Sequence, residues 1–362
     1  MNAQNEKILR VVDTGVLEGR LNIAIGQAII EAHQAGRAPD TLRFLRFPPT
    51  ALVGRHQALN QEVDLEYCGR HGIGVARRIT GGGAIFMAPG LLGWELAISR
   101  RCFAIRSLPD ITRHICEAAA EGISALGVDA RFRPRNDIEV GGRKISGTGG
   151  FFDGDTLFFQ GTVLVDMEPG QMTAALRVPA AKLQKRALDS AEQRVVTLRE
   201  LLGDATPEMA TVQAALAEAF AKRFGMQKRA QELEPAELEE AQALYQEDLG
   251  QEAFVNGIEE PAAARGDLAG QRTCPGGTIR AYLRLEGPAQ NRVRSALITG
   301  DFFVTPPRVI YDLESSLRGV YLDDLEARVR AFFDAAEVEV LSVTPDDFVA
   351  AFEDALAERN DP

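Results

Sequence analysis

Three consecutive glycines, Gly81–Gly83, constrain the fold of this chain more than any other stretch. They follow Arg77 and Arg78 directly, at the end of an apolar run (73–76) that predicts a short buried strand. Because every glycine costs conformational entropy on folding, three in a row indicate backbone that must pass close to something without Cβ atoms. Backbone N–H groups that bind an anion beside guanidinium charges are one such case. The stretch therefore predicts a bound nucleotide phosphate or acyl phosphate; the alternative is a plain glycine-rich turn.

A second glycine-rich segment follows further along the chain and carries one lysine. Residues 135–149 form two strand-like pieces on either side of Gly141 and Gly142, a sequence typical of a two-residue β-hairpin turn. Lys144 stands at the start of the return strand. As a compact charge on a flexible stem, it can reach both a phosphate and an acyl carbonyl oxygen. We take Lys144 as the candidate catalytic residue; the alternative is a solvated hairpin lysine.

Other chemical groupings are lacking in the sequence. It contains no Ser-His-Asp grouping, HExxH, GxGxxG or P-loop lysine motif, and its 4 histidines are scattered, so we expect no metal centre. Its 4 cysteines form no CxxC pair and are expected to be reduced and structural. The glycine loop and the lysine remain. Together they suit phosphoryl or acyl-phosphate chemistry, in which catalysis is mostly positioning and charge neutralisation.

The charge of the chain is unevenly distributed and limits the kind of partner. The net charge is −12, and the segment 226–260 holds 2 basic and 10 acidic residues. By contrast, residues 70–150 hold 12 basic and 7 acidic residues around the glycine loops. This pattern suits a small anionic ligand, whereas nucleic acid needs a broad basic face. Without a signal peptide or a long apolar run, we expect a cytoplasmic protein that binds neither nucleic acid nor membranes.

The length of 362 residues predicts more than one domain. Strand-like and helical patterns alternate over residues 1–225, which we expect to form the catalytic domain. Residues 226–261 are expected to form an acidic helical connector. Residues 262–362 are expected to form a small accessory domain, so that the whole chain is of the α+β class. His56, a lone histidine in a polar turn, is expected at the surface.

Taken together, the two glycine-rich segments resemble those of a known family. A triple glycine after Arg77 and Arg78, with Gly-Arg-Lys-Ile-Ser-Gly at 142–147, resembles the lipoate–protein ligases of the biotin/lipoate protein ligase superfamily. The segment 300–303, Gly-Asp-Phe-Phe, looks like the accessory domain of the bacterial type. The resemblance implies a mixed-sheet, biotin/lipoyl-ligase-like catalytic domain followed by a small α+β C-terminal accessory domain.

The resemblance also implies an activity. Lipoate would be activated with Mg-ATP to lipoyl-AMP, and the lipoyl group would pass to a lysine of a lipoyl-domain carrier protein. Glycine cleavage H-like proteins, acyltransferase lipoyl domains and related lipoate-binding proteins are the carriers it suggests. Magnesium would enter with ATP and would not be fixed by the protein alone, with Asp137 as a possible contact.

The resemblance assigns site residues position by position. ATP and lipoyl-AMP binding is implied for the second arginine, the glycine loop with the three residues after it, and the hairpin: Arg78, Gly81, Gly82, Gly83, Ala84, Ile85, Phe86, Asn136, Asp137 and Lys144. Lipoate binding is implied for the hairpin and a following strand: Lys144, Gly147, Gln160, Gly161 and Thr162.

Two departures from the family pattern stand out. Many members carry His-Asp after the aromatic residue of the glycine loop, whereas this chain continues with Met87, Ala88 and Pro89. The stretch 185–195, which corresponds to the family's adenylate-binding loop, is altered as well. Without the histidine, this chain lacks any acid–base or substrate contact that the histidine makes in other members. The altered stretch implies that the adenylate-binding loop behaves differently here.

Three rival interpretations follow. An octanoyl or lipoyl transferase of the same superfamily uses a cysteine and no ATP; where its thiol is expected, this chain has Arg131, and Cys102 falls too early. A biotin ligase would need a Gly-Arg-Gly-Arg loop, which is absent. A catalytically silent module that shelters lipoyl carriers is the third.

Overall fold

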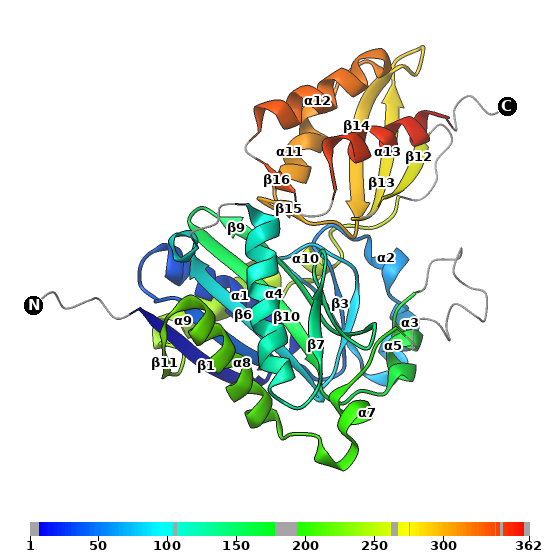
Figure 1. Ribbon diagram of the computed structural model, residues 1–362. Helices are drawn as coiled ribbons and strands as arrows, with labels where there is room; N and C mark the ends of the chain where they lie inside the picture. Colours follow the sequence, from blue (N-terminus) through cyan, green and yellow to red (C-terminus); the bar gives the residue numbers. More distant parts are fainter. Residues whose placement is uncertain are drawn as a thin grey trace, which may run out of the picture.

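The computed structural model describes residues 7–357, except 104–106, 178–193, 262–266, 275, 337, 341 and 342. It has a larger and a smaller part, which touch along one side (Figure 1). Both combine helices with sheets, and the larger sheet is mixed, so the predicted α+β class is confirmed. None of the described helices is long and apolar enough to cross a membrane.

Two sheets form the larger part. Its strands are β1 (Ile8–Val16), β2 (Thr41–Arg46), β3 (Thr50–Val53), β4 (Gly74–Arg77), β5 (Ile85–Met87), β6 (Leu91–Ser99), β7 (Ala130–Arg133), β8 (Asp137–Val140), β9 (Arg143–Asp153), β10 (Thr156–Leu164) and β11 (Gln227–Ala230). The main sheet has the order β11-β1-β2-β6-β10-β9-β8-β7. In it β1 runs parallel to β2 and β11, and the other neighbours are antiparallel. The small sheet has the order β4-β3-β5, so the triple glycine connects two of its strands.

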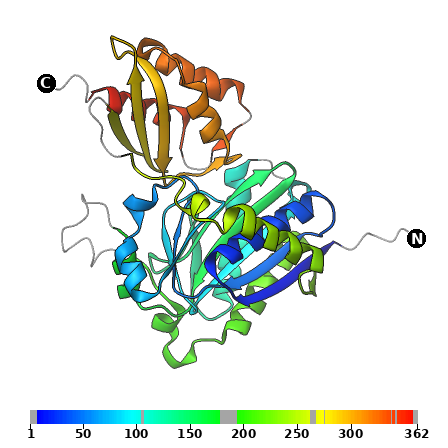
Figure 2. The same ribbon diagram turned by 180° about the vertical axis from the view of Figure 1, so that it is seen from behind.

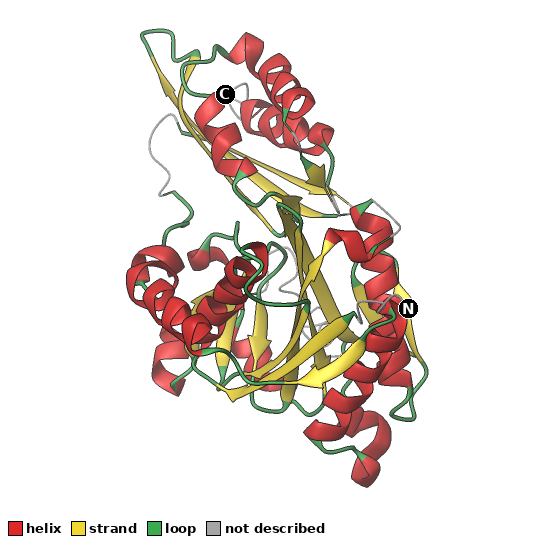
Figure 3. Ribbon diagram, turned by 90° about the vertical axis from the view of Figure 1, so that its left-hand side faces the viewer, coloured by secondary structure: helices red, strands yellow, loops and turns green. Residues whose placement is uncertain are grey.

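Helices cover both faces of the main sheet (Figure 3). They are α1 (Gly19–Gln34), α2 (Leu59–Glu62), α3 (Leu65–His71), α4 (Leu108–Ser124), α5 (Pro169–Ala175), α7 (Leu198–Leu202), α8 (Met209–Phe224), α9 (Pro235–Leu244) and α10 (Glu252–Val255). Because side chains alternate along a strand, neighbouring residues of β6 serve opposite faces. Trp94 packs with Phe220 of α8 in one core. Gly161 is required beside it, since any side chain there would collide with the indole ring.

The smaller part is one antiparallel sheet with helices packed on it. It contains β12 (Leu268–Cys274), β13 (Gly277–Glu286), β14 (Arg292–Gly300), β15 (Val304–Thr305), β16 (Glu339–Val340), α11 (Val309–Ser316), α12 (Leu325–Ala335) and α13 (Pro345–Ala357). Strands β12, β13 and β14 pair in that order, and α13 packs on β12 and β13. Side chains alternate along β13, with Ile279, Ala281 and Leu283 buried. Strand β12 and helix α11 were not predicted.

The acidic segment 226–260 differs from the single connecting helix that was expected. Its first residues form β11, an edge strand on β1, and Pro235 then starts the short helix α9. Glu237 of α9 is buried and makes two hydrogen bonds to Arg10 of β1, at 2.8 and 2.6 Å. Figure 2 shows α9 lying beside α1. At least one acidic residue of this segment, Glu237, is therefore buried in an ion pair with Arg10. Composition alone could not distinguish such a residue from one on the solvated face of a helix.

Arg77 ties the end of this segment to the small sheet. Its guanidinium is 2% exposed and donates to the carbonyl oxygens of Val255 at 2.8 Å, of Gly54 at 3.0 Å and of Gln57 at 2.7 Å. Buried carbonyl groups need hydrogen-bond donors, and one arginine supplies several of them here. Arg77 thus has a structural explanation that does not involve a ligand.

We expect Arg77→Leu to lower the free energy of unfolding by about 3 kcal/mol or more, because it leaves buried carbonyl groups without a donor. Urea unfolding followed by circular dichroism measures this. The control is Arg70→Leu, which removes an exposed arginine whose ion pair with Glu66, at 3.8 Å, is exposed as well; its cost should be below about 1 kcal/mol. Equal losses in the two variants would contradict the assignment of Arg77 as an anchor.

Candidate active site

One cavity of about 450 Å³ brings all the predicted site residues together. It lies between the glycine loop, the main sheet and the smaller part of the molecule. The predicted residues that line it are Arg78, Gly81, Gly82, Gly83, Ala84, Ile85, Phe86, Asn136, Asp137, Lys144, Gly147, Gln160, Gly161 and Thr162. Residues more than 80 positions apart in the sequence thus share one site of ligand-binding size.

Arg78 shapes the glycine loop. It is 4% exposed, and its Nη2 donates to the carbonyl oxygens of Gly81 at 3.0 Å and of Gly83 at 2.8 Å, while its Nη1 donates to that of Leu52 at 3.0 Å. One guanidinium therefore draws the carbonyl groups at both ends of the triple glycine to one side. Gly54 packs on this loop so closely that a side chain there would collide with the carbonyl oxygen of Gly82.

Two buried cations without a carboxylate lie beneath the loop. Burial, reinforced by the neighbouring Arg77, lowers the pKa of Arg78 to about 10, and burial likewise lowers that of Arg77 to about 10. Both stay protonated at neutral pH. Among the described residues neither forms an ion pair with an acidic side chain; their partners are chiefly carbonyl oxygens. Arg78, which lines the cavity, therefore contributes positive charge there, and Asp301 contributes the negative charge of a carboxylate near Gly83.

The triple glycine also provides room for the smaller part of the molecule. The N–H of Gly82 donates to the carbonyl oxygen of Phe302 at 3.1 Å, and a side chain on Gly81 would collide with that carbonyl. A Cβ on Gly82 would lie 2.5 Å from the ring of Phe303. The sequence suggested a close approach by an anion, and this structure adds a close approach by protein. Phe303 was missed because nothing near it in sequence points to the loop.

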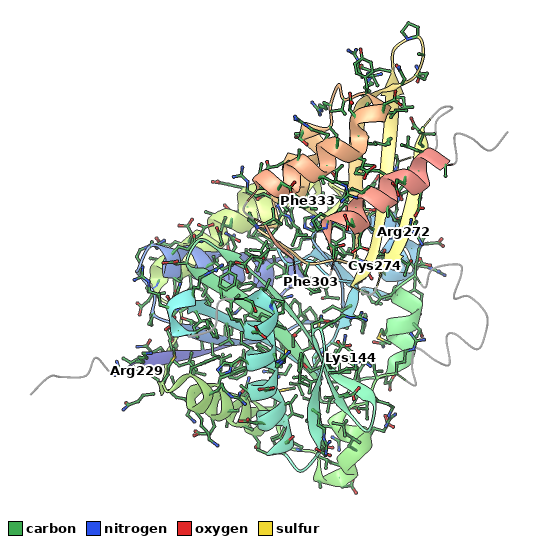
Figure 4. All side chains as sticks on the ribbon, turned by 45° about the horizontal axis from the view of Figure 1, so that its top comes forward. Lys144, Arg229, Arg272, Cys274, Phe303 and Phe333 are labelled. Carbon is green, nitrogen blue, oxygen red and sulfur yellow. The ribbon has the colours of Figure 1, made fainter. Side chains whose placement is uncertain are left out.

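Lys144 lies where the hairpin meets the cavity (Figure 4). Its Nζ is 2.8 Å from Oδ1 of Asp137, and its side chain crosses Gly147, where a Cβ would lie 2.7 Å from the same Nζ. Burial alone would raise the pKa of Asp137, but the charges of Lys144 and Arg133 outweigh it and hold that pKa below its ordinary value. The glycine at 147 is thus needed for the lysine to reach inward.

The hairpin that carries Lys144 is fixed by its own turn and by a neighbouring segment. Gly141 and Gly142 both have positive φ, as the predicted two-residue turn requires. Asn136, predicted to touch the nucleotide, donates from its side chain to the carbonyl oxygen of Thr148. The N–H of Lys144 donates to the carbonyl oxygen of Arg194 at 2.7 Å. Of the altered stretch 185–195, residues 185–193 lie outside the described residues.

The other half of the cavity is mostly apolar. Its walls come from α1, β2, β3, β5, β6, β10 and the segment around α5, with Ile23, Leu45, Phe47, Leu52, Met87, Leu91, Leu164, Met167, Met172 and Leu176. Met87 stands where many relatives were expected to have histidine, so this wall is apolar at that position. Such a surface suits a hydrocarbon chain.

The smaller part of the molecule completes the cavity. Gly276, Gly277, Asp301 and Phe303 line it, and Figure 4 shows Phe303 at the junction of the two parts. A side chain on Gly149 would collide with the Phe303 ring, so the ring lies over β9 as well as over the glycine loop. The cavity retains its 450 Å³ with this ring in place, so Phe303 forms a wall of the cavity.

The surface position expected for His56 is wrong. The side chain is 1% exposed and stacks on Phe302, with 5.2 Å between the ring centroids. Its carbonyl oxygen accepts a hydrogen bond from the N–H of Gly300 at 2.9 Å. Burial, with a further contribution from nearby arginines, lowers the pKa of His56 to about 3, so it is neutral at physiological pH. The residue belongs to the contact between the two parts, which its local sequence does not reveal.

All four cysteines are described, and none lines the cavity. Burial raises the pKa of Cys68, and it raises those of Cys102 and Cys116 to about 12, which makes them poor nucleophiles. Arg131, at the position where a transferase thiol was expected, is exposed and pairs with Asp129 at 2.9 Å.

The chain is similar to known proteins in both sequence and fold. Residues 18–221 match the family model described as the lipoyl protein ligase A/B catalytic domain. Octanoyltransferase LipM of Kyrpidia tusciae is 30% identical over 67% of this chain and 97% of its own length. A bi-partite lipoate protein ligase of Thermoplasma acidophilum, solved in a study that included its E2 lipoyl domain, is 26% identical with a TM-score of 0.63, over 72% of this chain and 99% of that one. A lipoate-protein ligase A bound with ATP is 25% identical with a TM-score of 0.61, over 70% and 99%.

Fold and site thus define an enzyme of the class that includes lipoate ligases and lipoyl or octanoyl transferases. The chain belongs to the lipoyl protein ligase A/B catalytic-domain family. The predicted resemblance is therefore confirmed.

Proposed function

We propose that this chain is an ATP-dependent lipoate–protein ligase. It activates lipoate with Mg-ATP to lipoyl-AMP, releasing pyrophosphate, and then transfers the lipoyl group to a lysine of a lipoyl-domain carrier protein. The observation that carries the proposal is the position of Lys144, whose ammonium group stands beside the cavity that joins an apolar half to a cationic glycine loop.

The residues around the cavity fit both substrates. The apolar half suits the acyl chain, and the glycine loop over Arg78 suits phosphate oxygens through backbone N–H groups and positive charge. Lys144 stabilises the negative charge that develops on the phosphate and on the acyl carbonyl oxygen. Magnesium enters with ATP. Asp137, the possible contact, is held by Lys144 and Arg133 in this structure and orients the lysine.

An ATP-independent octanoyl or lipoyl transferase is the second candidate, because octanoyltransferases are among the relatives. Such an enzyme needs a thiolate at the acyl group. Two observations favour the ligase: no cysteine lines the cavity, and the Arg78 guanidinium, which forms no ion pair among the described residues, lines it at the glycine loop. A silent binding module remains the third candidate and predicts no turnover at all.

Replacing Lys144 by alanine should lower lipoate-dependent exchange of pyrophosphate into ATP by about 100-fold or more, because the site loses a preorganised cation. Lys228→Ala is the matched control: Lys228 is 38% exposed against 36% for Lys144, and each lysine pairs with one carboxylate. The control should keep wild-type exchange. Unchanged exchange in Lys144→Ala would refute its catalytic role, and no exchange in the wild type would favour the transferase or the silent module.

Thiol blocking separates ligase from transferase. After treatment with N-ethylmaleimide, transfer of the lipoyl group to a lipoyl-domain carrier should still require ATP and should keep its rate, since no cysteine lines the cavity. Mass spectrometry of the carrier measures the added group. ATP-free transfer of octanoyl groups that disappears on thiol blocking would establish the transferase instead.

The smaller part of the molecule is proposed to close the site over the activated acyl group. Phe303→Ala opens the wall above Gly82 and Gly149, so water should enter and hydrolyse the intermediate. We expect carrier-independent release of AMP to rise about tenfold relative to carrier modification. Phe332→Ala, a half-buried phenylalanine of the same part whose side chain does not line the cavity, is the control and should leave the ratio unchanged. An unaltered ratio in Phe303→Ala would contradict this role.

A further inference from the structure

One charged pair lies within the otherwise apolar half of the cavity. Glu95 of β6 lines the cavity although it is only 5% exposed, and its Oε2 accepts a hydrogen bond from Nη1 of Arg43 at 2.9 Å. The other donors of Arg43 are used by Thr14 and Asn22. The Oε1 atom of Glu95, by contrast, accepts no hydrogen bond from the part of the chain that the structure describes, and it is not sealed from the cavity.

The other buried arginine–glutamate pair is built differently. Both carboxylate oxygens of Glu237 accept hydrogen bonds from Arg10, and Oε2 also accepts the N–H of Glu234. That pair is complete and lies away from the cavity. At Glu95 the helix opposite has Gly26, where a Cβ would lie 3.3 and 3.4 Å from the two oxygens. The helix thus leaves space beside the carboxylate and supplies no donor.

The sheet register places Glu95 two strands away from β9, the strand that carries Lys144. Across the sheet, Glu95 of β6 is opposite Gln160 of β10, which is opposite Gly149 of β9. Lys144 crosses Gly147 on β9, so two strand spacings, about 10 Å, separate the lysine's strand from that of Glu95. An acyl group with its carbonyl at Lys144 therefore brings the distal end of a medium-length chain towards Glu95.

We propose that Glu95 is a specificity-determining residue, which selects acyl chains with a hydrogen-bond donor, a hydroxyl or thiol, at the distal end. This inference rests on the proposed function. A plain hydrocarbon tail covers Oε1 without bonding to it, whereas a donor satisfies it. Among forms of lipoate, the open dithiol is favoured over the closed ring, because only the dithiol has S–H groups to donate.

Three synthetic acids test the preference, with acid-dependent pyrophosphate exchange as the readout. We expect 8-hydroxyoctanoate to exceed octanoate in kcat/KM by about tenfold, because a polar group left unpaired in the cavity penalises the analogue without a donor. The ketone 7-oxooctanoate, which only accepts hydrogen bonds, should be the poorest substrate. Equal values for the three acids would overturn the inference.

Glu95→Gln gives the sharper test. The amide oxygen can keep the hydrogen bond from Arg43, so the amide N–H group faces the cavity and the preference should move towards 7-oxooctanoate by about tenfold. Glu237→Gln makes the same change in a buried pair outside the cavity and should leave the ranking of acids as in the wild type. A purely structural role for Glu95 predicts the wild-type ranking in both variants, which would refute the proposal.

Two further measurements keep the inference testable if a variant fails to fold or if no acid supports exchange. Should Glu95→Gln fail to fold, the double variant Arg43→Met/Glu95→Leu removes both charges and should erase the preference. Should no acid support exchange, the proposed function fails, and titration calorimetry of the same acids with the wild-type protein still decides this inference. Tighter binding of 8-hydroxyoctanoate than of the other two supports it, and equal affinities overturn it.

Discussion

The site depends on the hydrogen bonds between the Arg78 guanidinium and the carbonyl oxygens of Gly81 and Gly83. A run of glycines has no preferred conformation of its own, so its shape must be imposed from outside. Arg78 does this from beneath, with Arg77 anchoring the strand that precedes it. Because Arg78 forms no ion pair with an acidic side chain of the described residues, the interaction that shapes the loop also places a positive charge beside it.

Because the glycines of the loop have no side chains, a segment of the smaller part of the molecule can also approach the loop closely. The loop with Phe302 and Phe303 touches Gly81, Gly82 and Gly149, and a Cβ at any of these would be crowded. Glycines in the two segments that define the family resemblance therefore also define where the smaller part of the molecule fits. The sequence offered one reason for the triple glycine, an anion, and the structure offers a second that is compatible with it.

Much of the fold and the site follows from local sequence. The short strand that leads into the triple glycine and the hairpin turn at Gly141 and Gly142 have local signals, and both were predicted. The predicted site residues line one cavity. They were assigned by resemblance to a family whose members use the matching positions in one site, so residues far apart in the sequence could be grouped together. What the sequence did not reveal depends on long-range contacts.

Three elements show why such contacts escaped prediction. Strand β11 exists because it pairs with β1 across more than 200 residues, so its acidic surroundings suggested a helix instead. His56 is buried only because Phe302 covers it. Phe303 reaches the cavity only because the smaller part docks there. In each case the residue or strand that makes the contact is distant in the sequence, so the local pattern of apolar and polar residues does not indicate the contact.

The two halves of the cavity differ in how their charges are balanced. At the glycine loop, Arg78 donates to carbonyl oxygens, which orient its guanidinium without cancelling its charge. In the acyl half, Arg43 is cancelled by Glu95, so no net charge opposes a neutral chain. The proposed substrates, a charged phosphate and a hydrocarbon chain, would need this separation, because an uncompensated charge beside the chain would have to be desolvated without a partner. The ion pair is thus the means by which a strand with a buried arginine can still form part of an apolar pocket.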